Sequence, residues 1–219
     1  MISPLISSLS TFIVTATLLS IAPGPEIILT LTVATSPVRK MGKWIVAGVA
    51  SGMTLWALAT PLGLSAIFTT NPKAFQILKW LGVGYLLYLS VRLLLESCKK
   101  PHTFENGAAP LHAVQSAKEA FQQGILSALL NPNVAVFFVL MFPTFIPSGF
   151  SAAQIKGILL LQGGIEVIIM TLYLTIVVLA AVPLKKLLDK GIALRFFYGI
   201  SGLLLLLCAA KLFMAQPPV

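Results

Sequence analysis

The sequence predicts an all-α integral membrane protein with six transmembrane helices, arranged as two inverted repeats of three spans, with spans one and four broken. Of the 219 residues, 58% are hydrophobic and only 10% are charged, whereas a soluble domain carries about 25% charged residues. Six apolar runs each reach the length of about 20 residues that a helix needs to cross a bilayer. Proline and glycine interrupt the first run, and proline and asparagine interrupt the fourth.

Charged, polar or proline-containing segments separate the six apolar runs. The runs cover residues 5–34, 44–68, 75–95, 121–142, 157–182 and 193–214. A backbone surrounded by lipid must satisfy its own hydrogen bonds, so each run is expected to form a helix. We therefore predict a single membrane domain over residues 1–219, with a first three-helix half at 1–95, a cytoplasmic loop at 96–120 and a second three-helix half at 121–219.

Basic residues are distributed unevenly between the two sides that these runs define. The segments around the first, third and fifth connections carry eleven Lys and Arg residues, and the opposite side carries four. The positive-inside rule places the richer side in the cytoplasm. Both termini are then expected outside the membrane.

The net charge of +9 does not indicate a nucleic-acid partner, because the basic residues are spread between apolar runs that face membrane lipid. Cys98 and Cys208 lie far apart, and His102 and His112 both lie in the long polar loop. No His, Cys and carboxylate residues therefore have the spacing of metal ligands. An intramembrane protease needs a serine and a histidine inside the membrane, so we expect neither an enzyme nor a cofactor.

Pro23, Gly24 and Pro25 interrupt the first run. Each proline removes a backbone donor and clashes with the preceding turn, and glycine weakens the helix further. A helix opened at membrane depth is tolerated only where it is buried in protein or lines a cavity. The half-helix that starts near Pro25 would point its positive N-terminal end at the break, which suits a solute carboxylate. A simple proline kink is the alternative.

Asn131, Pro132 and Asn133 interrupt the fourth run in a similar way. The Asn131 amide can donate and accept hydrogen bonds at the freed backbone groups. The same residue can instead form a polar contact between helices, worth about 1 kcal/mol or less, and the sequence leaves both interpretations open. Since each half holds three spans, the halves would enter the membrane in opposite directions, as in the inverted repeats of transporters.

Glu26 and Glu166 are the carboxylates inside apolar runs. A charged side chain in the middle of a membrane costs about 2.5–3.5 kcal/mol on insertion scales, and such residues mark ion or substrate paths. Ion pairs with Lys79, Arg92 or Lys211 are the structural alternative. The predicted translocation site comprises Pro23, Gly24, Pro25, Glu26, Asn131, Pro132, Asn133 and Glu166.

Several further segments occur in a recognisable order. They are residues 22–25, Gly48 with Gly52, residues 78–89, Gly124 followed by residues 131–133, Phe137 with Phe138, and Pro143 with Phe145. In this set the chain resembles the lysine-exporter / homoserine–threonine-resistance family of amino-acid exporters (LysE/RhtB type). The glycine pair, spaced as GxxxG, is also typical of close contact between membrane helices.

The resemblance implies secondary active export of an amino acid or related small metabolite across the bacterial inner membrane, driven by the proton gradient. Small solutes and protons would then be the partners, and a homo-oligomer is compatible with this function. The phosphate-binding pattern GxxxxGK[ST] is missing from the sequence, which favours ion coupling over ATP. A metal-ion exporter of related architecture is the alternative, because two intramembrane carboxylates can hold a cation.

Overall fold

The computed structural model describes residues 2–21, 24–70, 72–98, 114–147, 149–188 and 192–214, and all regular elements in these ranges are helices. Pro23, His102 and His112 lie outside the described residues. The α-helices in these ranges are α1 (Ile2–Ile21), α2 (Pro25–Ala34), α3 (Gly42–Thr70), α4 (Pro72–Cys98), α5 (Ala117–Leu130), α6 (Pro132–Val136), α7 (Ala152–Leu179), α8 (Ala181–Leu188) and α9 (Ile192–Met214). Three short turns complete them: η1 (Arg39–Met41), the π-turn η3 (Phe137–Met141) and the 3-10 turn η4 (Phe142–Phe145).

Both predicted helix breaks are present. The axes of α1 and α2 differ by 53°, and the axes of α5 and of the helical segment that follows it differ by 52°. The long stretches Arg39–Gly63 and Ala152–Leu179 are apolar enough to cross a membrane, and each bent pair has the length and composition of one further span. The described helices therefore supply up to four spans by length and composition.

Local backbone chemistry explains where the two breaks fall. Gly24 is extended, with φ −126° and ψ 176°, and Pro25 occupies the first turn of α2, where a missing N–H costs nothing. Asn131 is also extended, at φ −74° and ψ 113°, because the residue before a proline avoids the helical region. Pro61 lies inside α3 without ending that helix, so a single proline is not sufficient to divide a span here.

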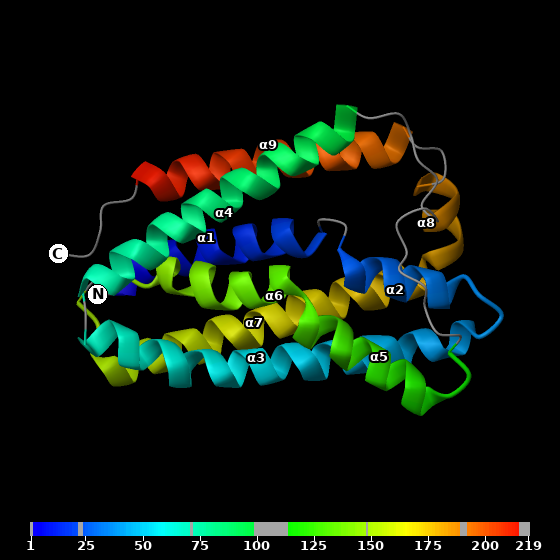
Figure 1. Cartoon of the computed structure of the whole chain (residues 1–219), viewed down its shortest axis with the longest axis horizontal. Coiled ribbons are helices and arrows are strands. Elements are labelled where there is room, and N and C mark those ends of the chain that lie inside the picture. Colours follow the sequence, from blue (N-terminus) through cyan, green and yellow to red (C-terminus); the bar gives the residue numbers. More distant parts are fainter. Residues whose placement is uncertain are drawn as a thin grey trace.

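The long helices run roughly parallel along the molecule (Figure 1). α4 packs along α9, α3 packs along both α5 and α7, and α1 lies against α7 and α9. α1 begins and α9 ends at the same end of the molecule, whereas α2 ends near α8 at the other end. The two broken spans start at opposite ends, since α1 runs towards the end from which α5 starts.

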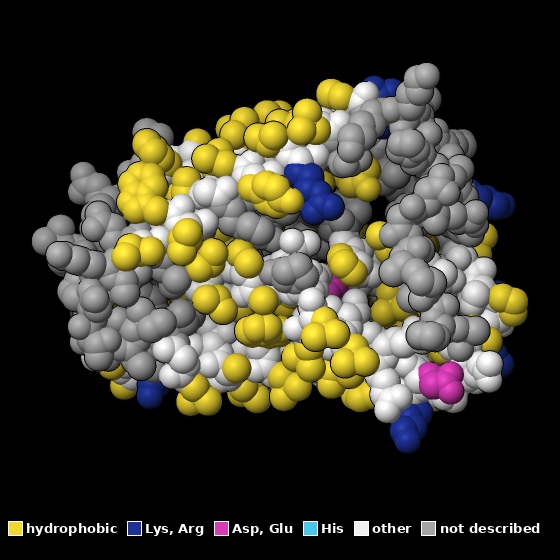
Figure 2. Space-filling model, in the orientation of Figure 1, with side chains coloured by type: hydrophobic (Ala, Val, Ile, Leu, Met, Phe, Trp, Pro, Cys, Tyr) yellow, Lys and Arg dark blue, Asp and Glu magenta, His cyan; other side chains and the backbone are white. Residues whose placement is uncertain are grey.

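Apolar side chains cover much of the outer surface, as Figure 2 shows for one face. Leu62, Leu130 and Leu179 are 74%, 75% and 81% exposed. A soluble monomer rarely exposes large continuous apolar patches, so this surface suits contact with lipid chains.

Glycine brings α3 and α5 into backbone contact. A Cβ atom at Gly48 would lie 2.2 Å from the Phe121 carbonyl oxygen, and one at Gly124 would lie 2.3 Å from the Ile45 carbonyl oxygen. One turn further along, a Cβ at Gly52 would lie 2.8 Å from the Ala128 Cβ. The close contact expected from the glycine pair is therefore confirmed.

Replacing Gly48 by alanine is expected to force α3 and α5 apart. Overpacking of this kind costs about 1–3 kcal/mol, so Gly48→Ala should lower the melting temperature of detergent-purified protein by several degrees. Gly157→Ala is the matched control, because Gly157 is exposed on α7 and a Cβ there meets no atom within 4 Å. Equal melting temperatures for the two variants would contradict a backbone contact between α3 and α5.

Candidate functional site

The two helix breaks meet through a buried hydrogen bond. The Asn131 amide Nδ2 donates to the Glu26 carboxylate Oε1 at 2.7 Å. Glu26 is 3% exposed and Asn131 is 5% exposed. The segments beside the two helix breaks are thus joined by a contact between two buried side chains.

The Asn131 side chain has two roles at once. Its Oδ1 accepts a hydrogen bond from the Asn133 backbone N–H at 2.8 Å, which caps the start of α6. Because the carbonyl oxygen is used in this cap, the NH₂ group is directed at Glu26. The two interpretations that the sequence left open for Asn131, backbone cap and contact between helices, both hold.

Glu26 lies in the first turn of α2, close to the open backbone of the first break. The Gly24 carbonyl accepts hydrogen bonds from the N–H groups of Ile27 and Ile28, both at 3.1 Å. The positive end of α2 therefore already faces a carboxylate from the protein itself, and a solute carboxylate would have to compete with it.

Glu166 contacts the opposite side of the same break. The Ser20 hydroxyl, one residue before the end of α1, donates to Glu166 Oε1 at 2.9 Å. The Tyr173 hydroxyl reaches the carbonyl oxygen of Ile21 at 3.4 Å. Glu166 is thus hydrogen-bonded to the last turn of α1, whereas Glu26 belongs to the first turn of α2.

No ion pair to either acid is found in the part of the chain that the structure describes. The Arg92 side chain is exposed, and the side chains of Lys79 and Lys211 lie outside the described set. Figure 2 shows a hollow near the middle of one face with acidic atoms at its bottom. The described acids are Glu26, Glu119 and Glu166, and Glu119 is exposed at the start of α5, so these atoms belong to one of the buried acids.

Four buried side chains on the helices around the breaks have polar atoms without a hydrogen-bond partner among the described residues, and three of them, Gln162, Trp56 and Thr30, were not in the predicted site. The atoms are Glu166 Oε2, both polar atoms of the Gln162 carboxamide, Trp56 Nε1 and Thr30 Oγ1. More than nine in ten buried polar groups in proteins have a partner. The one sequence signal for Gln162 is its position four residues before Glu166, which places both side chains on one face of a helix.

Aromatic rings fill the space between α1 and the segment after the second break. Phe12 makes edge contacts with Phe142 and Phe145, at centroid distances of 5.1 and 5.5 Å. Phe138 stacks at 6.4 Å on Trp56 and lies 4.5 Å from Phe142. Along their helices these rings lie roughly two to four turns from the breaks, on the side where α1 begins.

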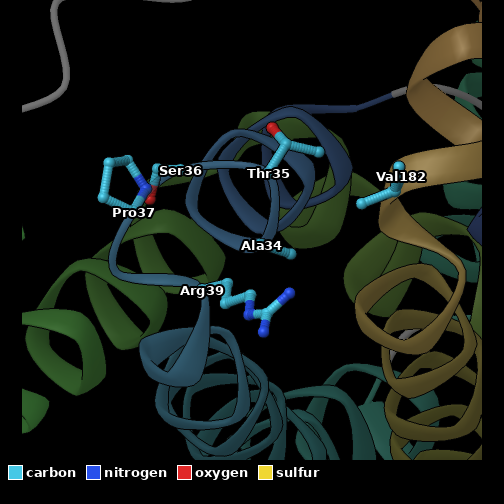
Figure 3. Close-up of a pocket in the computed structure, with 6 residues that line it drawn as sticks. All are labelled: Ala34, Thr35, Ser36, Pro37, Arg39 and Val182. Carbon is cyan, nitrogen blue, oxygen red and sulfur yellow. The ribbon is translucent and has the colours of Figure 1, made fainter.

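A pocket of about 520 Å³ lies at the other end of α2 (Figure 3). The Arg39 side chain extends beneath the last turn of α2, and Val182 faces it from α8. The lining residues are Ala34, Thr35, Ser36, Pro37, Arg39 and Val182. Because α2 has ten residues and a helix rises 1.5 Å per residue, this pocket lies roughly 15 Å from the first break.

Interrupted helices that meet around buried carboxylates are typical of secondary transporters, and the comparisons with known proteins agree. The model of the LysE type translocator family matches residues 17–216. The chain belongs to the LysE-type translocator family, which confirms the predicted resemblance to amino-acid exporters. It is therefore a membrane transport protein.

Two relatives illustrate the range of the family. The homoserine/homoserine lactone efflux protein of Salmonella typhi is 31% identical over 171 residues, which cover 75% of this chain and 78% of that protein. The uncharacterized membrane protein YrhP of Bacillus subtilis is 26% identical over 203 residues, which cover 90% of this chain and 94% of that protein. No solved structure matches the chain significantly.

The alternative of a metal-ion exporter gains nothing from these comparisons. Within the described ranges, no three His, Cys, Asp or Glu side chains are grouped so that they could hold a metal ion. The two buried acids are instead bonded to an amide and a hydroxyl.

Replacing Asn131 by alanine is expected to destabilise the protein by about 2–4 kcal/mol. The substitution leaves a buried carboxylate without its donor, at about 1–3 kcal/mol, and removes a helix cap, at about 1 kcal/mol. Ser116→Ala is the matched control, because it removes only the cap that Ser116 gives to Glu119 at the exposed start of α5. Thermal unfolding of purified variants measures both; equal losses would show that the bond to Glu26 does not stabilise the fold.

Proposed function

We propose that the protein exports a small amino-acid-like solute across the inner membrane in exchange for protons. The hydrogen bond between Glu26 and Asn131 carries this proposal, because it brings two helix breaks to one place beside a second buried acid. Family membership gives the solute class. The activity for which the Salmonella relative is named, efflux of homoserine and its lactone, points to compact polar amino acids or their lactones.

We place six spans in the membrane, adding α4 and α9 to the four spans already described. Their 27 and 23 residues give lengths of about 40 and 35 Å, enough to cross a bilayer core of about 30 Å. The halves α1–α4 and α5–α9 form the proposed inverted repeat. The opposite starting ends of the two broken spans support it, as does the matching contact of α3 with α5 and of α7 with α1.

The proposed orientation follows from the charged ends of the molecule. The end formed by the end of α2, α8 and the start of α5 carries Arg39, Lys40, Lys43, Lys118, Lys186 and Arg195. Lys156, at the start of α7, lies at the opposite end. The positive-inside rule then puts the pocket at Arg39 on the cytoplasmic side and both termini in the periplasm.

Glu166 is the proposed proton carrier, and the chemistry needs no catalytic step. Its Oε1 is held by Ser20, whereas Oε2 is left for a proton or for a solute ammonium group. The Glu166 carboxylate binds an ammonium group strongly only when it is ionised. Binding of the solute ammonium group therefore releases the proton to the cytoplasm. A proton from the periplasm then displaces the solute outward, which couples the two fluxes.

Gradient-driven transport in inverted membrane vesicles tests this proposal. With an acidic lumen, vesicles with the wild-type protein should accumulate L-homoserine, and Glu166→Gln should reduce accumulation at least about tenfold because the side chain no longer binds a proton. Exchange of labelled for unlabelled solute without a gradient should fall less than accumulation does, because the Gln amide oxygen still accepts a hydrogen bond from the solute ammonium group. Glu119→Gln is the matched control, since Glu119 is exposed at the start of α5.

Two results would contradict the proposed export mechanism. If Glu166→Gln accumulates solute at the wild-type rate and with the same pH profile, Glu166 does not carry the coupled proton. If vesicles with the wild-type protein exchange no amino acid or lactone at all, the proposed function is wrong.

A further inference from the structure

Gln162 is the most unusual buried residue that the proposed transport cycle does not use. Its side chain is 0% exposed, and neither Oε1 nor Nε2 has a hydrogen-bond partner among the described residues. A buried carboxamide without partners destabilises the folded state on both its donor and its acceptor side. A residue that only filled space at this position would be apolar.

The position of Gln162 relates it directly to the proposed site. Residues four apart on a helix lie about 5–6 Å apart at Cβ and on the same face. Gln162 and Glu166 therefore lie one turn apart on the same face of α7. Tyr173, seven residues beyond Glu166, continues the same stripe and contacts the end of α1. α7 therefore presents a polar row to the first helix break.

The contact between α7 and α3 places a third unpartnered group near this row. A Cβ at Gly163 would lie 2.6 Å from the Cβ of Ala57, so the two helices touch at the residues directly after Gln162 and Trp56. The Trp56 indole Nε1 is buried and unpartnered in the described structure, and its ring stacks on Phe138. Two side chains with unused polar atoms thus flank one crossing.

The buried polar atoms without a hydrogen-bond partner indicate which ligand groups would complement them. Glu166 Oε2 accepts a hydrogen bond, as from an ammonium group, and the indole N–H donates one, as to an oxygen. The carboxamide donates and accepts, which matches a hydroxyl group because a hydroxyl also does both. A small amino acid with an ammonium group and a side-chain hydroxyl satisfies this set, whereas an amino acid with a methyl group in place of the hydroxyl does not.

We propose that the Gln162 carboxamide, one helical turn from Glu166 on α7, binds the side-chain hydroxyl of the transported solute and selects hydroxyl-bearing amino acids over their methyl isosteres. The proposal rests on the proposed function and adds the residue that sets its specificity. A site built to bind a hydroxyl rejects the analogue that lacks it strongly, because its own polar atoms then stay unpaired.

The test compares L-homoserine with L-norvaline, which has a methyl group where homoserine has the hydroxyl. Both compete with labelled homoserine for exchange in proteoliposomes that contain the purified full chain. The wild-type protein should prefer homoserine by about 100-fold or more. Gln162→Met, which keeps the shape and removes both polar atoms, should reduce the preference to within about threefold. Gln122→Met, at an exposed position on α5, should keep it.

Thermal unfolding of the same variants separates binding from a structural role. Gln162→Met should melt at or above the wild-type temperature, because it removes unpaired buried atoms. A clear fall in melting temperature would show that the amide has a structural partner, and would overturn the proposal. An unchanged preference in Gln162→Met, or a wild-type protein that exchanges both compounds equally, would overturn it while leaving the proposed export intact. A wild-type protein that exchanges neither compound nor any other amino acid or lactone would refute both proposals.

Discussion

The hydrogen bond between the Asn131 amide and the Glu26 carboxylate joins two points that lie 105 residues apart in the chain. Each helix break opens backbone groups that lipid cannot satisfy, so each needs protein around it. Asn131 closes one break by capping α6 and reaches the other through Glu26. Because both breaks meet, the open helix ends share one polar interior, and Glu166 borders that interior from α7.

The fold could be predicted largely from helix-breaking chemistry and from apolar length. The tripeptide at 23–25 and the Asn-Pro pair at 131–132 mark the two bends that the structure contains, because they combine proline with glycine or asparagine. Pro61 shows the limit of such reasoning, since a proline inside α3 leaves that helix in one piece. The sequence predicted a close helix contact at Gly48 and Gly52, but it did not predict that α5 is the partner.

The sequence identified Glu26, Glu166 and the neutral residue Asn131 as candidate site residues, but not Ser20 or Gln162. A carboxylate in an apolar run is rare enough to identify Glu26 and Glu166 directly. Their partners, Asn131 and Ser20, depend on how distant helices align, and this alignment leaves no local pattern in the sequence. Gln162 was overlooked because a single neutral polar residue is ordinary in a membrane helix; only its lack of a partner in the folded protein distinguishes it.

The glycine crossing of α3 and α5 also limits how the molecule can move. Where two backbones touch directly, as at Gly48 and Gly124, no long side chains lie between the helices to change rotamer and let one slide past the other. α3 and α5 should therefore move together as one rigid body. Any rocking motion of the other helices would pivot about α3. The polar interior would have to open first to one side of the membrane and then to the other. This change would occur at the two helix breaks, residues 24 and 131, which would act as hinges.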